Sequence, residues 1–289
     1  MQTSRDTLGI KWRKPIGWLL GLVAHGGAWL YVLFLIVPLY YILISSVKTN
    51  TEVFRSPVLP LGSAGFDNYV NAFNFAALGQ ALGNSAYIAL VALILTLLLA
   101  VPAAFGLARS TGRVADTIEK IFALGFLIPG FAALVPTTLL AISLGLFQTR
   151  EFLILFFPAT ALPLTIILLV QAMRAIPPEL EESAIIDRAG TLDILWHIYV
   201  PLTSPTVALV TIVNFLNFWN EYFFTLVIGG PREDVRTVQV ALPTLTSQTN
   251  AQFGILAAGI VISLIPVYIA YAFTARRMEQ ALLAGAVKG

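Results

Sequence analysis

Two groups of polar side chains have types and spacings that could support chemistry, and the first lies between residues 177 and 202. This short stretch holds five of the fifteen acidic residues of the chain, namely Glu179, Glu181, Glu182, Asp187 and Asp193. A carboxylate is unfavourable in hydrocarbon, yet apolar runs long enough to cross a membrane flank the stretch on both sides. We therefore expect residues 177–202 to face water, where they can meet a soluble partner.

The second group is a polar stripe in the apolar run that follows. Asn214, Asn217 and Glu221 recur at i, i+3 and i+7, which places them on one helical face, with Asn220 at its edge. This face should look away from lipid, either at another helix or into a pathway for a polar solute, and both interpretations stay open. Trp219 beside the stripe is either part of an interfacial aromatic belt, which the pattern favours, or a wall on which a sugar could stack.

Residue patterns typical of enzymes are absent from the sequence. It contains no G-x-x-x-x-G-K-[ST] phosphate-binding loop, no H-E-x-x-H metal motif and no G-x-S-x-G nucleophile motif. Its two histidines, His25 and His197, fall far apart in the expected topology, and it has no cysteine. We predict no catalytic residue, no metal site and no cofactor in this chain, so another chain must supply the energy for any active process.

These polar groups belong to a chain with the composition of a membrane protein. Apolar residues make up 58% of its 289 residues and charged residues 11%, against about 25% charged in soluble domains. We therefore predict an all-α integral membrane protein with six transmembrane helices, each long enough for about 30 Å of hydrocarbon. The six spans are 26–47, 84–107, 118–144, 152–173, 206–228 and 253–275. The first is too long for a signal peptide and lacks a cleavage site, and a net charge of +2 is too small to indicate nucleic acid binding.

The distribution of basic residues orients these spans. With the N-terminus inside, the expected cytoplasmic segments, together with Lys120 at the cytoplasmic end of the third span, hold twelve of the seventeen Lys and Arg residues. The exterior segments hold the other five, as the positive-inside rule predicts. This orientation gives cytoplasmic tails at 1–25 and 276–289, a transmembrane domain at 26–275, and a cytoplasmic position for residues 177–202.

Residues 177–202, called the elbow below, contain start and stop signals for two short helices joined by a bend. Pro177 and Pro178 suit a helix start, where a missing N–H costs nothing. Gly190 is placed to end that helix in a left-handed conformation, and Thr191 to cap a second helix. Pro201 then lacks the donor that a longer helix would need. We expect a helix–turn–helix at the membrane surface.

The elbow resembles the EAA loop of bacterial ABC importer permeases. That loop has the pattern E-A-A, three residues, G, nine residues, I-x-L-P, and this chain matches its spacing with Glu182-Ser183-Ala184, Asp187 and Ile198-x-Val200-Pro201. Within this match, Ser183 replaces an alanine, and Arg188 stands where the family usually has glycine. Gly190, two residues later, is expected to supply the bend instead.

Further similarity points to one subgroup of that family. W-N-E-Y at 219–222, TVQVALPTL at 237–245 and the terminal GAVKG at 285–289 resemble MalG-type permeases of carbohydrate importers. The resemblance implies the type I ABC importer permease fold with a cytoplasmic EAA coupling helix, in the bacterial cytoplasmic (inner) membrane. It also implies a second permease subunit, two ATP-binding subunits that hold ATP and Mg, an external solute-binding protein, surrounding membrane lipid and a sugar substrate.

The same resemblance assigns roles to individual residues. It implies ATPase coupling for Glu181, Glu182, Ser183, Ala184, Asp187, Arg188, Gly190, Ile198 and Pro201, with Glu182 as the polar anchor. Gly285, Lys288 and Gly289 near the C-terminus are further candidates for contact with the ATPase. The candidates for the substrate pathway are Asn214, Asn217, Trp219, Asn220 and Glu221. ATP-driven closure of the ATPase would move the elbow as a lever and turn the spans from inward-open to outward-open.

Other functions predict different features. An ion-coupled secondary transporter would need charges inside the spans and inverted repeats, and only Glu221 is a candidate charge. A membrane-embedded enzyme would need an acid–base or nucleophile pair, which the chain lacks. Within the ABC class, amino acids, peptides or glycerol phosphate are alternative cargoes. A phosphorylated solute would favour Arg or Lys in the pathway, and no predicted span interior has one.

Overall fold

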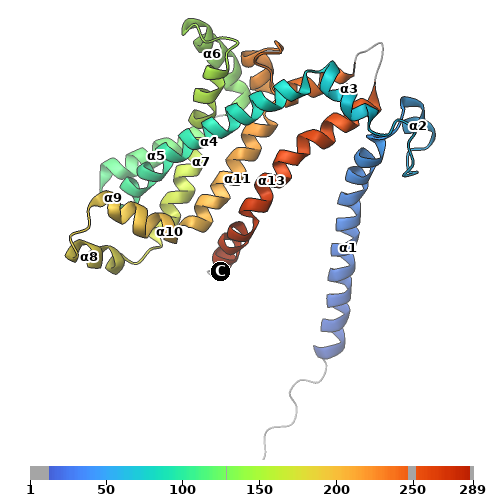
Figure 1. Ribbon diagram of the computed structural model, residues 1–289. Helices are drawn as coiled ribbons and strands as arrows, with labels where there is room; N and C mark the ends of the chain where they lie inside the picture. Colours follow the sequence, from blue (N-terminus) through green and yellow to red (C-terminus); the bar gives the residue numbers. More distant parts are fainter. Residues whose placement is uncertain (1–12, 128, 247–251, 287–289) are drawn as a thin grey trace, which may run out of the picture.

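The computed structural model describes residues 13–127, 129–246 and 252–286, and within these ranges the chain is built of helices without a β-strand. Four helices are long and apolar enough to cross a membrane, namely α1 (Arg13–Ser45), α4 (Leu78–Arg109), α7 (Arg150–Arg174) and α13 (Phe253–Ala286) (Figure 1). They correspond to the first, second, fourth and sixth predicted spans. The all-α membrane architecture is therefore confirmed.

The third predicted span, 118–144, is wrong as a single helix. It is divided into α5 (Arg113–Phe126) and α6 (Gly130–Ser143), whose axes differ by 98°. Pro129 precedes α6 with an extended backbone, φ −65° and ψ 123°. Proline has no N–H, and its ring clashes with the preceding turn of a helix, so the chain turns at this point.

The fifth predicted span, 206–228, is also interrupted. Helix α11 (Ser204–Asn220) ends where Glu221 takes an extended backbone, φ −68° and ψ 120°, and a π-helical turn, η2 (Thr225–Gly229), follows. The Glu221 side chain accepts the N–H of Phe224 at 2.8 Å, which starts the second segment in the manner of a helix cap. Residues 191–202 and α11 form another bent pair, at 77°. Six spans result only if the bent pairs at α5–α6 and at 191–220 each count as one.

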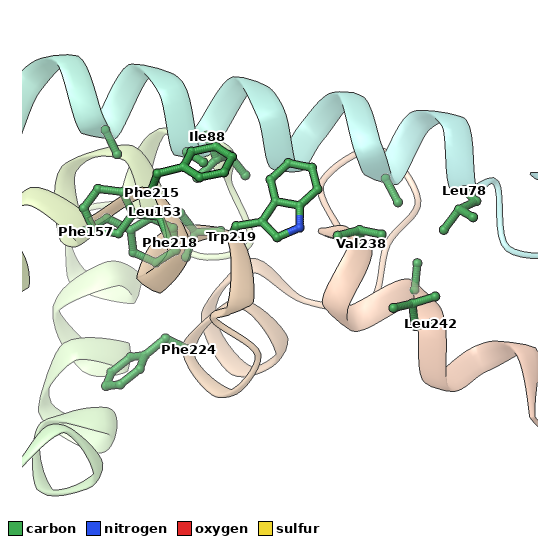
Figure 2. Close-up of a cluster of buried hydrophobic side chains, with 14 of the residues drawn as sticks. Leu78, Ile88, Leu153, Phe157, Phe215, Phe218, Trp219, Phe224, Val238 and Leu242 are labelled. Atoms are coloured by element: carbon green, nitrogen blue, oxygen red, sulfur yellow. The ribbon is translucent and has the colours of Figure 1, made fainter. Parts of the chain in front are cut away.

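The other helices pack around α4. Helix α7 lies along α4, α11 and α13 extend the same body, and α1 stands apart from it except at its C-terminal end (Figure 1). The buried cluster beside α4 contains large aromatic side chains from α7 and α11, including Phe157, Phe215 and Trp219 (Figure 2). Ala89 and Ala92 of α4 are almost completely buried in this cluster. Small residues of this kind let helices approach closely inside a membrane.

Segments from two of the predicted exterior connections, residues 48–83 and 229–252, lie near one end of the molecule. Helices α2 (Asn50–Arg55) and α3 (Asp67–Phe75) lie between α1 and α4, and the N–H of Phe253 at the start of α13 donates to Asn50 Oδ1 at 2.8 Å. The segment 237–245 is folded rather than open and forms α12 (Val238–Ala241) and the 3₁₀ turn η3 (Leu242–Leu245). The N–H of Val238 donates to Ser85 Oγ of α4 at 2.8 Å. This segment is therefore fixed to the first turns of α4.

Candidate functional site

The elbow is helical over most of its length. It consists of α8 (Pro178–Ile186), α9 (Thr191–Ile194), the π-helical turn η1 (Leu195–Tyr199) and α10 (Val200–Leu202). Glu179 and Glu181 lie in the first turn of α8, where the positive end of the helix dipole favours carboxylates. Figure 1 shows α8 and α9 at the end of the molecule opposite to α2, α3 and α6. The structure therefore contains the predicted helix–turn–helix.

The bend between α8 and α9 lies at Arg188 and not, as predicted, at Gly190. Arg188 has the left-handed φ of 61°. Its N–H donates to the carbonyl of Ile185 at 2.9 Å, and the N–H of Ala189 donates to the carbonyl of Ala184 at 3.0 Å. These two bonds form the Schellman pattern that ends many helices, usually with glycine in the left-handed position. Here an arginine occupies that position.

Gly190 begins the next helix instead of ending the previous one. Its backbone is extended, φ −71° and ψ 162°, and its N–H donates to Asp193 Oδ2 at 3.2 Å. Thr191, predicted to be the cap, is the first residue of α9. The prediction failed because the left-handed position is set by the last hydrogen bonds of α8, which stop two residues before the glycine.

Replacement of Arg188 by glycine is expected to stabilise the elbow. An L-residue in the left-handed region is less favourable than glycine by about 1 kcal/mol, so Arg188→Gly should raise the midpoint of thermal unfolding by about 2–4 °C. Unfolding of the detergent-purified chain measures this shift. Gly190→Ala is the matched control and should change little, because its φ suits alanine and the nearest atom to a new Cβ is the end of the Asp193 side chain. A lower midpoint for Arg188→Gly would contradict the strain argument.

A π-helical turn precedes Pro201. In a regular α-helix the proline ring would clash with the carbonyl of His197, four residues earlier. The wider turn of η1 relieves this clash, and the helix continues to Leu202, one residue beyond Pro201. The hydroxyl of Thr203 then donates to the carbonyl of Tyr199 at 2.7 Å, where the chain bends into α11.

The second half of the elbow is anchored in a hydrophobic cluster of its own. Ile194, Leu195 and Tyr199 are buried and pack against buried side chains of α4 and α7. Ile198 is partly buried at the edge of this cluster, and Pro201 is exposed. Residues 194–199 are therefore held against the ends of two long helices.

Helix α8, in contrast, has no buried residue. Three of its apolar side chains are strongly exposed, with Leu180 at 45%, Ile185 at 53% and Ile186 at 81%. Most of the predicted coupling residues in this region are exposed as well, namely Glu182, Ser183, Asp187, Arg188 and Gly190. Ala184 is partly buried. A short helix that presents apolar and acidic side chains to the outside is typical of a surface that binds another protein.

Glu181 is the exception, because its carboxylate faces α4. It forms an ion pair with Arg109 near the end of α4, and it accepts the hydroxyl proton of Tyr199 at 2.7 Å. Its side chain is only 16% exposed, so its carboxylate binds within the chain, and its predicted contact with the ATPase stays a prediction. Sequence reasoning missed Arg109 and Tyr199 as its partners. The only signal was an arginine at the end of a long apolar run, and basic residues are common at the ends of membrane helices whatever they contact.

The polar stripe of α11 is divided between two environments. Asn214 is buried and donates to Thr165 Oγ1 of α7 at 2.9 Å, so it joins two helices and does not line a pathway. Asn217 is exposed, and Asn220 accepts a hydrogen bond from Gln239 at 3.2 Å. Glu221 lies beyond the helix end. The predicted single face therefore does not extend to Glu221.

Asn217 and Glu221 nevertheless line one cavity of about 470 Å³ between α5, α6, α7 and α11. The aromatic rings of Phe126 and Phe156 contribute to its apolar wall, and Thr160 adds a hydroxyl group. A cavity of this size with apolar walls and a few polar groups is typical of sites that bind small molecules.

Trp219 is part of the protein core. Its side chain is 2% exposed, its indole N–H donates to the carbonyl of Ser263 in α13 at 3.2 Å, and its ring stacks on Phe215 with centroids 5.7 Å apart (Figure 2). Neither an interfacial belt nor a wall of a solute pathway fits this position, so both predictions for Trp219 are wrong. The side chain points towards α4 and α13, away from the cavity that Asn217 lines.

The C-terminal candidates are described only in part. Gly285 lies in the last turns of α13, whereas Lys288 and Gly289 lie outside the described residues. In the described parts of the chain, no group of three or more His, Cys, Asp or Glu side chains could hold a metal ion.

Comparison with known proteins assigns this architecture to a family. Residues 97–280 match the family described as the binding-protein-dependent transport system inner membrane component. The chain belongs to this family. It is 31% identical to the diacetylchitobiose uptake system permease protein NgcG of Streptomyces coelicolor, over 91% of this chain and 87% of that protein. It is 28% identical to the arabinooligosaccharides transport system permease protein AraQ of Halalkalibacterium halodurans, over 95% of this chain and 97% of that protein.

A solved structure has the same fold. It is a bacterial ABC transporter involved in the import of the acidic polysaccharide alginate, and it matches with a TM-score of 0.80 at 23% identity over 93% of this chain and 100% of that chain. Together with the family, this match confirms the ABC importer permease fold. The chain is a permease component integral to the inner membrane, and the ion-coupled alternative is set aside.

Proposed function

We propose that this chain is one permease of an ATP-binding-cassette importer that carries a sugar or oligosaccharide across the inner membrane. The observation that carries the proposal is that α8 has no buried residue, whereas residues 194–199 in the second half of the elbow are anchored in a hydrophobic cluster. The full sequence has no phosphate-binding loop, so ATP and Mg belong to two partner subunits, and the chain itself is not an enzyme.

Helix α8 is the proposed contact with the ATP-binding subunits. Glu182, Ser183 and Asp187 present hydrogen-bonding groups beside the exposed Ile185 and Ile186. A shallow groove next to them runs between the end of α8 and the start of η1. Closure of the ATPase around α8 would displace the elbow as a unit, because residues 194–199 are packed firmly behind it.

A second permease is needed to complete the pathway. Asn217 is exposed on α11, and Glu221 lines the same cavity. Neither an amide nor a carboxylate is stable against lipid, so another protein chain must cover this side. Helix α1 offers a further surface for the second permease. Only 6% of its most apolar stretch is buried, and the Phe34 side chain is 76% exposed.

A carbohydrate suits the cavity better than a phosphorylated solute. Aromatic rings can pack on the apolar faces of sugars, while Asn217 and Thr160 can bond to hydroxyl groups. Among the described residues that line the cavity there is no lysine or arginine, which a phosphate would favour. The relatives named for diacetylchitobiose and arabinooligosaccharides support the same substrate class.

We infer that the elbow lies on the cytoplasmic side of the membrane. Helix α1 begins, and α13 ends, towards the end of the molecule where the elbow lies (Figure 1). The charge distribution favours this side as cytoplasmic, since the sequence segments predicted to lie there hold twelve of the seventeen basic residues. Both termini then lie in the cytoplasm, and an external solute-binding protein would dock on the opposite end, at α2, α3 and residues 231–245.

Replacement of Asn217 by leucine is expected to slow uptake of the sugar about fivefold to tenfold, because a lost hydrogen bond weakens binding by about 1 kcal/mol. Uptake of labelled sugar is measured in cells that express all subunits, with the amount of assembled complex determined by pull-down. Gln171→Leu, at an exposed amide of α7 that does not line the cavity, is the control and should not change uptake. An unchanged rate for Asn217→Leu would remove Asn217 from the pathway.

Purification of the tagged chain in mild detergent, followed by mass spectrometry, tests the proposed function as a whole. An ATPase with a phosphate-binding loop and a second permease should co-purify with it. Sugar screening of the accompanying solute-binding protein then identifies the cargo. A chain that runs alone and transports without ATP in liposomes would contradict the proposal.

A further inference from the structure

Four side chains join the elbow directly to the cytoplasmic end of α4. The carboxylate of Glu181 in α8 pairs with Arg109 and accepts the hydroxyl proton of Tyr199 at 2.7 Å. The Arg109 guanidinium carbon lies 4.8 Å from the centre of the Phe105 ring, and the Tyr199 ring meets Phe105 edge-on with centroids 4.9 Å apart. We call Phe105, Arg109, Glu181 and Tyr199 the α4–elbow cluster.

The four side chains of the cluster contact one another and are partly shielded from water. The side chains of Arg109 and Glu181 are 27% and 16% exposed, and Tyr199 as a whole is 5% exposed. Removal of one partner from a charge pair in such surroundings leaves the other charge poorly compensated. The stacked ring and the hydrogen-bonded hydroxyl also restrict the rotamers of both charged side chains. The contact is therefore more rigid than an exposed surface ion pair.

Helix α4 is attached at its other end as well. Asn84 Nδ2 donates to the carbonyl of Arg236 at 3.1 Å, and Ser85 Oγ accepts the N–H of Val238 at 2.8 Å. Arg150 donates to Asn84 Oδ1 at 3.2 Å, which fixes the amide in place. Helix α4 is continuous from Leu78 to Arg109, with Pro102 in its last turns, so one helix joins the elbow to the segment 236–238 on the opposite side.

We propose that the α4–elbow cluster transmits displacement of the elbow to α4, and through α4 to the segment 236–238. This inference rests on the proposed function, in which an ATPase displaces the elbow. The covalent route from the elbow to α11 passes through a 77° bend at Thr203, whereas the route through Glu181 and Arg109 is a direct contact. Arg109, Glu181 and Tyr199 are thus positioning residues that couple the cytoplasmic movement to the exterior segment.

Charge reversal in the assembled transporter tests this role. Arg109→Glu and Glu181→Arg, each alone, should lower the sugar transported per ATP hydrolysed by at least about tenfold, because each places two like charges in contact. The double variant exchanges the charges and should restore the ratio to within about threefold of the unmodified complex. Glu119→Arg is the matched control, since the ion pair of Glu119 with Arg174 joins α5 to α7 and does not include the elbow. This variant should leave the ratio unchanged.

A conformational measurement separates transmission from simple stabilisation. The chain has no cysteine, so Asp234→Cys introduces a single exposed thiol near the segment 236–238. The rate at which maleimide labels this thiol should change when ATP is added to a complex that carries Asp234→Cys and an intact α4–elbow cluster. This ATP-dependent change should disappear with Arg109→Glu and return in the double charge exchange.

Three results would overturn the inference. One is an unchanged transport ratio in assembled complexes of both single variants. Another is an ATP-dependent labelling change that persists in Arg109→Glu. The third is failure of the double exchange to restore the ratio although the complex assembles. Failure of the proposed function itself looks different, because the unmodified preparation would then contain no ATPase.

Discussion

Replacement of Trp219 by alanine is expected to lower the free energy of unfolding by about 3 kcal/mol, at the lower end of the range for such truncations. The indole is 2% exposed, stacks on Phe215 and donates to the carbonyl of Ser263. Truncation leaves a large cavity between α4, α11 and α13 and removes that hydrogen bond. We expect a loss of unfolding free energy at the lower end of that range, because burial of an apolar side chain stabilises a protein less in a membrane than in water.

Thermal unfolding of the detergent-purified chain checks this prediction. Trp29→Ala is the matched control, since Trp29 in α1 is 69% exposed and its removal should change the stability of the isolated chain little. Trp219→Phe keeps a ring but loses the N–H, so it should lower stability by only about 1 kcal/mol. Equal effects of Trp219→Ala and Trp29→Ala would show that Trp219 is not a core residue.

The long helices were predictable because their cause is local. An uninterrupted apolar run of about 20 residues has only one way to satisfy its backbone in lipid, which is a helix. Helices α1, α4, α7 and α13 follow from this argument without knowledge of their neighbours. The breaks at Pro129 and Glu221 do not, because a proline inside a span can be bridged by neighbouring helices or can end the helix. Tertiary contacts decide between these outcomes.

The elbow, too, was predictable from the sequence only in part. Its existence followed from three prolines, a cluster of carboxylates and a glycine, all within 26 residues, counted from 177 to 202. Its left-handed residue was misplaced at Gly190, since glycine is the usual occupant and only the hydrogen bonds of α8 identify Arg188. The family spacing pointed to Arg188 independently, as the position where glycine is usual.

Contacts between distant segments were beyond sequence reasoning. Glu181 and Glu182 are neighbours with the same charge, yet one faces Arg109 and the other faces outward. Trp219 and Asn217 are two residues apart on one helix, yet one lies in the core and the other lines the cavity. A helical pattern gives the angle between such residues but does not say which direction leads to the core.

Replacement of Glu182 by lysine is expected to abolish coupling while leaving the chain inserted in the membrane. Glu182 is exposed on α8, so a lysine there disturbs no core packing. A charge reversal at the centre of a protein interface weakens it by about 2 kcal/mol or more, which corresponds to at least about a 30-fold loss of sugar uptake. The measurement is sugar uptake and ATP hydrolysis in the same reconstituted complex.

Two further variants define the origin of that loss. Glu182→Gln keeps the shape and the hydrogen-bonding capacity without the charge, and it should retain more uptake than Glu182→Lys. Glu151→Lys makes the same charge change at an exposed residue in the first turn of α7, away from the elbow, and should leave the coupling between hydrolysis and uptake intact. Uptake at the unmodified rate in Glu182→Lys would contradict α8 as the ATPase contact. The contact would then have to lie on the groove between the end of α8 and the start of η1, where Asp187 and His197 are the next residues to exchange.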